Sequence, residues 1–252
     1  MFGFLKRRRR ARVLARHSIP DDLWRRVVSS TPALARLDDG ARSRLRDLTL
    51  LFLHEKRFDA AHGLALTDAM RVKIAALACR LVLELGLDCY SGFHSVIVYP
   101  GEFLVRDREH IDDAGVVHVG DETLSGEAWE LGPVVLSWAD VEQSGQGDGY
   151  DVVAHEFAHK LDGLDGATNG MPPLHRGMSP RVWSETFSRA YDALVARVDG
   201  GSDTWLDPYA AESPAECFAV CVEMFFDVPV EFRREYPALY EQLAAYFKQT
   251  PR

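Results

Sequence analysis

The sequence is poor in cysteine and has no long apolar run. Only four of its 252 residues are cysteines, too few for a disulfide framework, and cysteines in apolar settings are usually small core residues. No stretch of about 18 apolar residues occurs, so no membrane span is expected. The first residues also lack the apolar segment of a secretory signal. These absences argue against a secreted disulfide-rich domain and a transmembrane protein, and they favour the cytoplasm.

Charge is unevenly distributed along the chain. Residues 6–16 contain seven basic residues and no acidic one, whereas the remainder contains 22 basic and 38 acidic residues, a net charge of −16. A basic segment on an acidic body could contact nucleic acid, anionic lipid or an acidic partner, but terminal segments are more often solvated and frayed. We therefore expect residues 1–18 to form a flexible basic arm, and we expect no direct binding of nucleic acid.

The spacing of apolar residues changes near residue 88. Between Ile19 and Leu87 it has the period of helices, and Ile74–Leu85 is apolar enough to be a central buried helix. Four strand-like segments follow, at residues 93–99, 102–105, 115–119 and 133–138. Helical spacing returns after residue 151. The chain is therefore predicted to be α+β, with a helical N-terminal subdomain at 19–88 and a domain at 89–252 that combines a small mixed sheet with helices.

The stretch VVAHEFAHKLD carries the main chemical signal. His155 and His159 are four residues apart, so on a helix their side chains project side by side and can bind one zinc ion. Glu156 would lie beside the metal, where it can take a proton from water that the metal makes acidic. Asp151 and Gly163 stand where an N-cap and a helix stop are expected. A chance HExxH match is expected in only about two chains of this length in a hundred, so the motif is specific.

A catalytic zinc site usually has three protein ligands, so one more is needed. Glu216 lies in the first turn of a predicted helix that begins after Ser213, and from there a carboxylate could reach a metal on another helix. The same pattern is also that of a capping box, in which Glu216 bonds back to the backbone of Ser213. Asp165, Glu212 and Glu223 are alternative ligands. Spacing alone does not choose among them.

The segment 163–180, which follows the histidine helix, is rich in glycine and proline. A loop of this length inside a compact domain is usually functional. We expect it to form a mobile lid over the site. His175, within it, could fill the open metal position in a resting form, although a solvent-exposed loop histidine is the simpler interpretation.

The segments HEFAHKLD, AAESPAECFAV, GFHSVIVYP and GPVVLSW together resemble the Mlc titration factor A family of bacterial zinc metallopeptidases, with a likeness that extends from about residue 51 to about residue 247. The resemblance implies a zincin-like fold of the gluzincin type, similar to the catalytic domain of anthrax lethal factor. It implies one Zn²⁺ per chain, bound by His155, His159 and Glu216, with Glu156 as the base. It also suggests that Tyr209 faces the site, although Tyr209 could equally be a packed loop aromatic.

The resemblance also implies a function. The family is associated with aminopeptidase-like cleavage of short peptides, and with binding of a transcriptional repressor of sugar uptake that would connect it to the glucose phosphotransferase system. A peptide substrate could lie along residues 133–138 if they form an edge strand, and Tyr209 could donate a hydrogen bond to the oxyanion. The alternative is a repressor-sequestering binding protein in which zinc is structural or regulatory. A base such as Glu156 has no use in a purely structural site.

Overall fold

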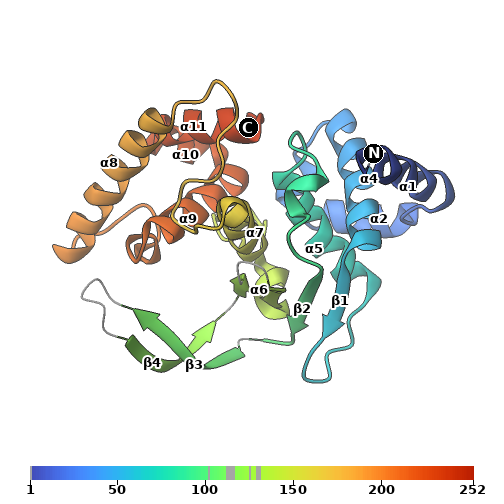
Figure 1. Cartoon of the computed structure of the whole chain (residues 1–252), viewed down its shortest axis with the longest axis horizontal. Coiled ribbons are helices and arrows are strands. Elements are labelled where there is room, and N and C mark those ends of the chain that lie inside the picture. Colours follow the sequence, from blue (N-terminus) through green and yellow to red (C-terminus); the bar gives the residue numbers. More distant parts are fainter. Residues whose placement is uncertain (1, 102, 112–116, 125, 129–131) are drawn as a thin grey trace.

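The computed structural model describes residues 2–101, 103–111, 117–124, 126–128 and 132–252. Helices dominate it, with α1, α2 and α4 at one end, α8 at the other and α7 near the middle (Figure 1). The helices are α1 (Phe2–Arg16), α2 (Asp21–Ser29), α3 (Pro32–Ala35), α4 (Asp39–Glu55), α5 (Asp68–Leu81), α6 (Trp138–Gln143), α7 (Val152–Asp162), α8 (Pro180–Asp199), α9 (Pro214–Asp227), α10 (Pro229–Glu235) and α11 (Pro237–Phe247), with short 3-10 helices η1 (Leu87–Tyr90), η2 (Gly163–Asp165) and η3 (Pro208–Ala211). The strands are β1 (Arg57–Ala60), β2 (Ser95–Tyr99), β3 (Phe103–Ile111), β4 (Val117–Leu124), β5 (Gly126–Ala128) and β6 (Val134–Ser137).

Four of the strands form one small sheet in the order β1-β2-β6-β5. β1, β2 and β6 are parallel and β5 is antiparallel to β6, while β3 and β4 form a separate antiparallel pair. The prediction of helices combined with a small sheet is confirmed. The prediction of an edge strand at 133–138 is wrong, because β6 lies between β2 and β5. All four residues of β6 are buried, as is typical of an inner strand.

Two features of the N-terminal part differ from the sequence prediction. The basic segment is a helix, α1, rather than a frayed arm, because Arg10 pairs with Glu55 at 2.7 Å and Val13 packs against the core. β1 lies within the segment that was expected to be helical, and it pairs in parallel with β2. This strand is only four residues long and its burial does not alternate, so the sequence carries no period-two pattern that would reveal it.

The apolar core is one continuous cluster that reaches from α2 and α5 through β2 and β6 to α9 and α11. α5 is buried along most of its length, as predicted for a central helix. The division of the chain at residues 18 and 88 stays a prediction. Residues 102 and 115–116, at the ends of two predicted strands, lie outside the described residues. Within the described ranges, no helix is long and apolar enough to cross a bilayer.

α7 is fixed at both ends and along its apolar face. Asp151 caps it, with the carboxylate accepting a hydrogen bond from the backbone of Ala154 at 3.0 Å, and the helix ends at Asp162, directly before Gly163. Both caps agree with the prediction. Phe157 is fully buried on the side of α7 that faces the core, in edge and tilted contacts with the rings of Phe52, Tyr90 and Phe93. The two histidines therefore project from a helix with little freedom to shift.

Candidate metal centre

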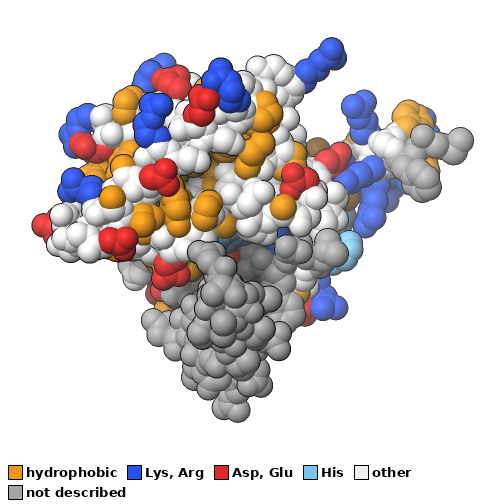
Figure 2. Space-filling view, turned by 60° about the vertical axis from the view of Figure 1, so that its left-hand side comes forward, with side chains coloured by type: hydrophobic (Ala, Val, Ile, Leu, Met, Phe, Trp, Pro, Cys, Tyr) orange, Lys and Arg blue, Asp and Glu red, His pale blue; other side chains and the backbone are white. Residues whose placement is uncertain are grey.

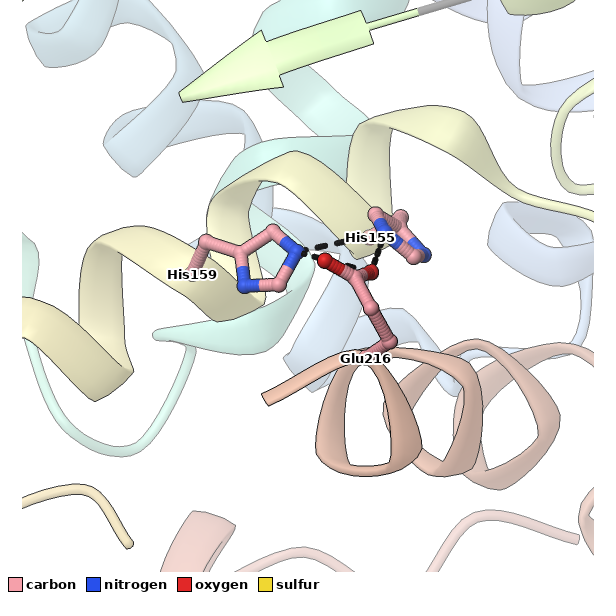
Figure 3. A group of neighbouring side chains, drawn as sticks. All are labelled: His155, His159 and Glu216. Atoms are coloured by element: carbon pink, nitrogen blue, oxygen red, sulfur yellow. Dashed lines mark hydrogen bonds and ion pairs between the residues drawn. The ribbon is translucent and has the colours of Figure 1, made fainter. Parts of the chain in front are cut away.

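His155 and His159 of α7 and Glu216 of α9 point toward one another (Figure 3). Glu216 Oε2 is 2.9 Å from His155 Nε2 and 3.3 Å from His159 Nε2, and the two Nε2 atoms are 3.2 Å apart. One donor atom from each residue lies within 4.8 Å of the other two. Among the described residues, no other three His, Cys, Asp or Glu side chains come together in this way.

The spacing of these donors fits a tetrahedral metal ion. Zinc binds imidazole nitrogen and carboxylate oxygen at about 2.0–2.2 Å, which places neighbouring ligand atoms about 3.3–3.5 Å apart. The observed separations of 2.9, 3.2 and 3.3 Å are close to that. Two imidazoles and one carboxylate are also the donor set of a catalytic site that keeps a fourth position open. The residues present therefore fit a metal ion.

The start of α9 resolves the two interpretations of Glu216. Ser213 caps the helix, its Oγ accepting a hydrogen bond from the backbone N–H of Glu216 at 3.2 Å, and Pro214 is the first helical residue. The Glu216 carboxylate turns to the two histidines of α7 instead of returning to the Ser213 backbone. The cap is thus made by the serine alone, and the Glu216 carboxylate is available to bind a cation together with the two histidines.

Glu223 lies on the other side of His155. Its Oε1 is 2.8 Å from His155 Nδ1, and its Oε2 accepts a hydrogen bond from the backbone of Asp151 at 2.7 Å. A carboxylate on the far nitrogen fixes the orientation and tautomer of a ligating imidazole. Of the alternative ligands, Glu223 contacts His155 from outside the three-residue group, and neither Asp165 nor Glu212 belongs to that group.

The polar contacts behind His155 continue into the core through a buried ion pair that the sequence did not predict. Arg80 of α5 contacts Asp151 at 2.7 Å, with both side chains almost fully buried. Asp151 caps α7 and its backbone N–H binds Glu223, so a buried polar chain joins Arg80 to His155. A buried arginine needs a paired carboxylate. The signal was available, because Arg80 interrupts the apolar run AALACRLVL, but its partner could not be read from the sequence.

Charge in the cluster is shared between imidazole and carboxylate. Burial lowers the pKa of His155, but hydrogen bonds with Glu216 and Glu223 outweigh it and raise this pKa well above its ordinary value. Burial raises the pKa of Glu216, yet hydrogen bonds with His155 and His159 hold it far below the ordinary range. The space between these side chains thus favours positive charge, which a proton or a metal cation can supply.

Glu156 and Tyr209 lie next to the cluster without belonging to it. Glu156 is 5% exposed on α7. Burial lowers the pKa of Lys160 to about 8 although the negative charge of Glu156 acts in the opposite direction, so these two groups are near each other. Tyr209 of η3 is partly exposed, and its ring centroid is 5.9 Å from that of His155. The negative charge of Glu156 also contributes to the raised pKa of His155, so both predicted residues lie near His155.

The loop 163–180 is anchored to the body of the protein. Gly170 donates its N–H to Asp162 at 2.7 Å and accepts a hydrogen bond from the indole of Trp183 at 3.0 Å. His175 bonds the backbone oxygen of Tyr246 at 2.7 Å and stacks on its ring. His175 therefore does not reach the metal cluster, and these contacts argue against the predicted mobile lid.

The helix-rich fold and the His-His-Glu cluster are together consistent with a metallopeptidase. Residues 5–248 match the family described as glucose-regulated metallo-peptidase M90, and the chain belongs to this family. Two proteins named Mlc titration factor A, from Yersinia pestis (strain Pestoides F) and Yersinia pseudotuberculosis serotype O:1b (strain IP 31758), are each 39% identical to it over 231 residues, or 90% of this chain and 84% of each relative. The resemblance inferred from the sequence motifs is confirmed.

Proposed function

We propose that the chain is a zinc-dependent peptidase of the gluzincin type with a zincin-like fold. His155, His159 and Glu216 would hold one Zn²⁺, and Glu156 would be the general base. The convergence of the three donor atoms within 4.8 Å of one another carries this proposal. The donor set favours zinc, since imidazole and carboxylate with one open position are typical of catalytic zinc sites. The membership of this chain in a metallo-peptidase family supports a metal-dependent peptidase.

The roles that we propose for the residues agree with their positions. Bound zinc would supply Lewis-acid chemistry, polarising a peptide carbonyl and making water acidic enough to lose a proton near neutral pH. Glu156, buried beside His155, would take the proton from the attacking water and return it to the leaving amine. Tyr209 would donate a hydrogen bond to the oxyanion that develops on the carbonyl. Glu223 would keep the His155 ring in one orientation.

Short peptides cleaved from the amino end are the substrates we propose, following the family resemblance. We place the protein in the cytoplasm, and its four cysteines, which are all unpaired, agree with a reducing compartment.

A second function is suggested by the relatives' name, Mlc titration factor A. This chain would then also bind a DNA-binding repressor and withdraw it from its operator. Peptidase activity and repressor binding can coexist in one protein.

Two substitutions distinguish a catalytic from a structural metal site. Glu156→Gln should keep zinc and lose hydrolysis of short peptides by a factor of about 100 or more, because it removes only the base. Glu216→Gln should lose zinc, because an amide oxygen is a much weaker ligand than a carboxylate. Zinc content is measured on purified protein and hydrolysis on a series of short peptides.

Ser213→Ala is the matched control for Glu216→Gln, because it removes the helix cap and leaves the carboxylate in place. This variant should lower the free energy of unfolding by about 1 kcal/mol and leave the zinc content almost unchanged. Full activity in Glu156→Gln, or zinc bound equally well by Glu216→Gln and the wild type, would contradict the assignment.

A further inference from the structure

α1 has two different faces. On the inner face, Arg10 makes a bidentate contact with Glu55 at 2.7 and 3.0 Å and also reaches Asp88 at 2.9 Å. Lys6 pairs with Asp88 as well, and Val13 packs against the apolar core. These contacts hold the helix on α4 and determine which side of it faces outward.

The outer face combines exposed arginines with exposed apolar side chains. Five of the seven basic residues are exposed and have no acidic neighbour within α1: Arg7, Arg8, Arg9, Arg12 and Arg16. Phe4 and Leu5 are 60% and 59% exposed, among the most exposed large apolar residues of the described chain. The Arg8 guanidinium lies over the Phe4 ring at 4.4 Å. The exposed side of α1, which covers more than half of the helix circumference, therefore offers both cations and apolar groups to a partner.

This face is at the outer limit of the molecule. α1 is the outermost helix at its end of Figure 1, and Figure 2 shows blue Lys and Arg side chains on and beside the part of the molecule that projects at the right. The chain outside residues 6–16 has a net charge of −16, which an anionic surface repels. Electrostatic interactions fall off within about 8 Å at physiological ionic strength, so acidic residues on the far side of the body oppose binding through α1 only weakly.

We propose that the outer face of α1 binds the surface of an anionic lipid bilayer, with the arginines at the lipid phosphates and Phe4 and Leu5 in the headgroup region. Clusters of basic residues on a helix attract anionic lipid headgroups, and apolar side chains that enter the interface add to the binding. A nucleic-acid duplex would satisfy the arginines but offers no comparable site for two neighbouring apolar side chains. The proposal does not depend on the proposed peptidase activity, since α1 contributes no residue to the metal cluster.

The test uses the full-length protein and sedimentation with lipid vesicles. Vesicles of three parts phosphatidylcholine to one part phosphatidylglycerol should bind about tenfold or more tightly than pure phosphatidylcholine, and added salt should weaken the binding. The double variant Phe4→Ser/Leu5→Ser keeps every charge and should bind the anionic vesicles about tenfold or more weakly. Val230→Ser, at a 63% exposed position on α10, is the matched control and should bind like the wild type.

A second variant separates the contribution of charge. Arg8→Gln/Arg12→Gln should weaken binding by about tenfold or more and reduce its salt dependence. Circular dichroism and zinc content should be unchanged in all variants, since α1 lies away from the metal cluster. Equal binding to neutral and anionic vesicles would overturn the proposal. So would unchanged binding in Phe4→Ser/Leu5→Ser, or a preference for duplex DNA over anionic vesicles that the same variant leaves intact.

Discussion

Gly170 couples the loop after α7 to the helix that carries Glu216. Its φ is +77°, in the left-handed region. A Cβ atom at this position would lie 2.4 Å from Pro214 O and 2.9 Å from Pro214 C. Because these are backbone atoms of the first residue of α9, no side-chain rotation can relieve the clash. Gly170→Ala therefore has to displace either the loop or the start of α9.

The cost of Gly170→Ala has two parts that a control separates. An alanine with positive φ costs about 1–2 kcal/mol. Gly166→Ala carries this cost alone, since its φ is +91° and no atom lies within 4 Å of the added Cβ. The clash at Gly170 adds about 1–3 kcal/mol, the usual cost of overpacking, so the total should be about 2–5 kcal/mol. If the loop and the start of α9 move apart by about 1 Å, Glu216, two residues beyond Pro214, moves as well. Metal–ligand distances tolerate changes of only about 0.2 Å, so zinc binding should weaken.

The assay compares the wild type, Gly166→Ala and Gly170→Ala. Urea unfolding gives the free energy of unfolding, and titration against a competing chelator gives the zinc affinity. We expect Gly170→Ala to be the less stable variant and to bind zinc about tenfold or more weakly, while Gly166→Ala keeps the wild-type affinity. Equal stability and equal zinc affinity in the two variants would refute the close contact between the loop and α9.

Three further results are expected. Glu223→Gln should weaken zinc binding by about 10–100-fold without unfolding the protein, because it loosens the His155 ring; an unchanged affinity in the chelator titration would remove Glu223 from the site. Burial raises the pKa of Asp162 from 3.8 to about 6, so the folded state keeps a proton that the unfolded state loses, and this group lowers the stability of the metal-free protein as pH rises from about 4 to about 6. In Asp162→Asn, the free energy of unfolding measured with urea should fall less over this pH range than in the wild type. The same pH dependence in both proteins would contradict the raised pKa of Asp162. Finally, chelation of the metal should lower the melting temperature of the wild type but not of His155→Ala, whereas equal losses in both would place the stabilising metal elsewhere.

The local part of the candidate metal site could be predicted from the sequence. The four-residue spacing of His155 and His159 places both side chains on one side of any α-helix, whatever surrounds it. The caps at Asp151 and Gly163 are also local, because they depend on the hydrogen-bonding needs of the helix ends. The apolar spacing of α5 was strong enough to identify a buried helix. These features depend on residues within a few positions of one another.

Contacts between distant segments were decided by the tertiary structure. Glu216 occupies a position that satisfies a capping pattern, and only the packing of α7 against α9 turns its carboxylate to the histidines. The same packing places Glu223 behind His155, although spacing had allowed it as a ligand. Arg80 and Asp151 are 71 residues apart, and no periodic pattern connects them.

The sheet and α1 also depend on contacts between distant segments. β1 and β6 are each only four residues long, so their positions in the sheet depend on which strands lie beside them rather than on their own residues. The basic run of α1 is compatible with a frayed arm, and it becomes an ordered helix through carboxylates on α4 and η1. Helical spacing is fixed by backbone geometry within a few residues, whereas the partner of a strand or a charge is selected by the fold as a whole.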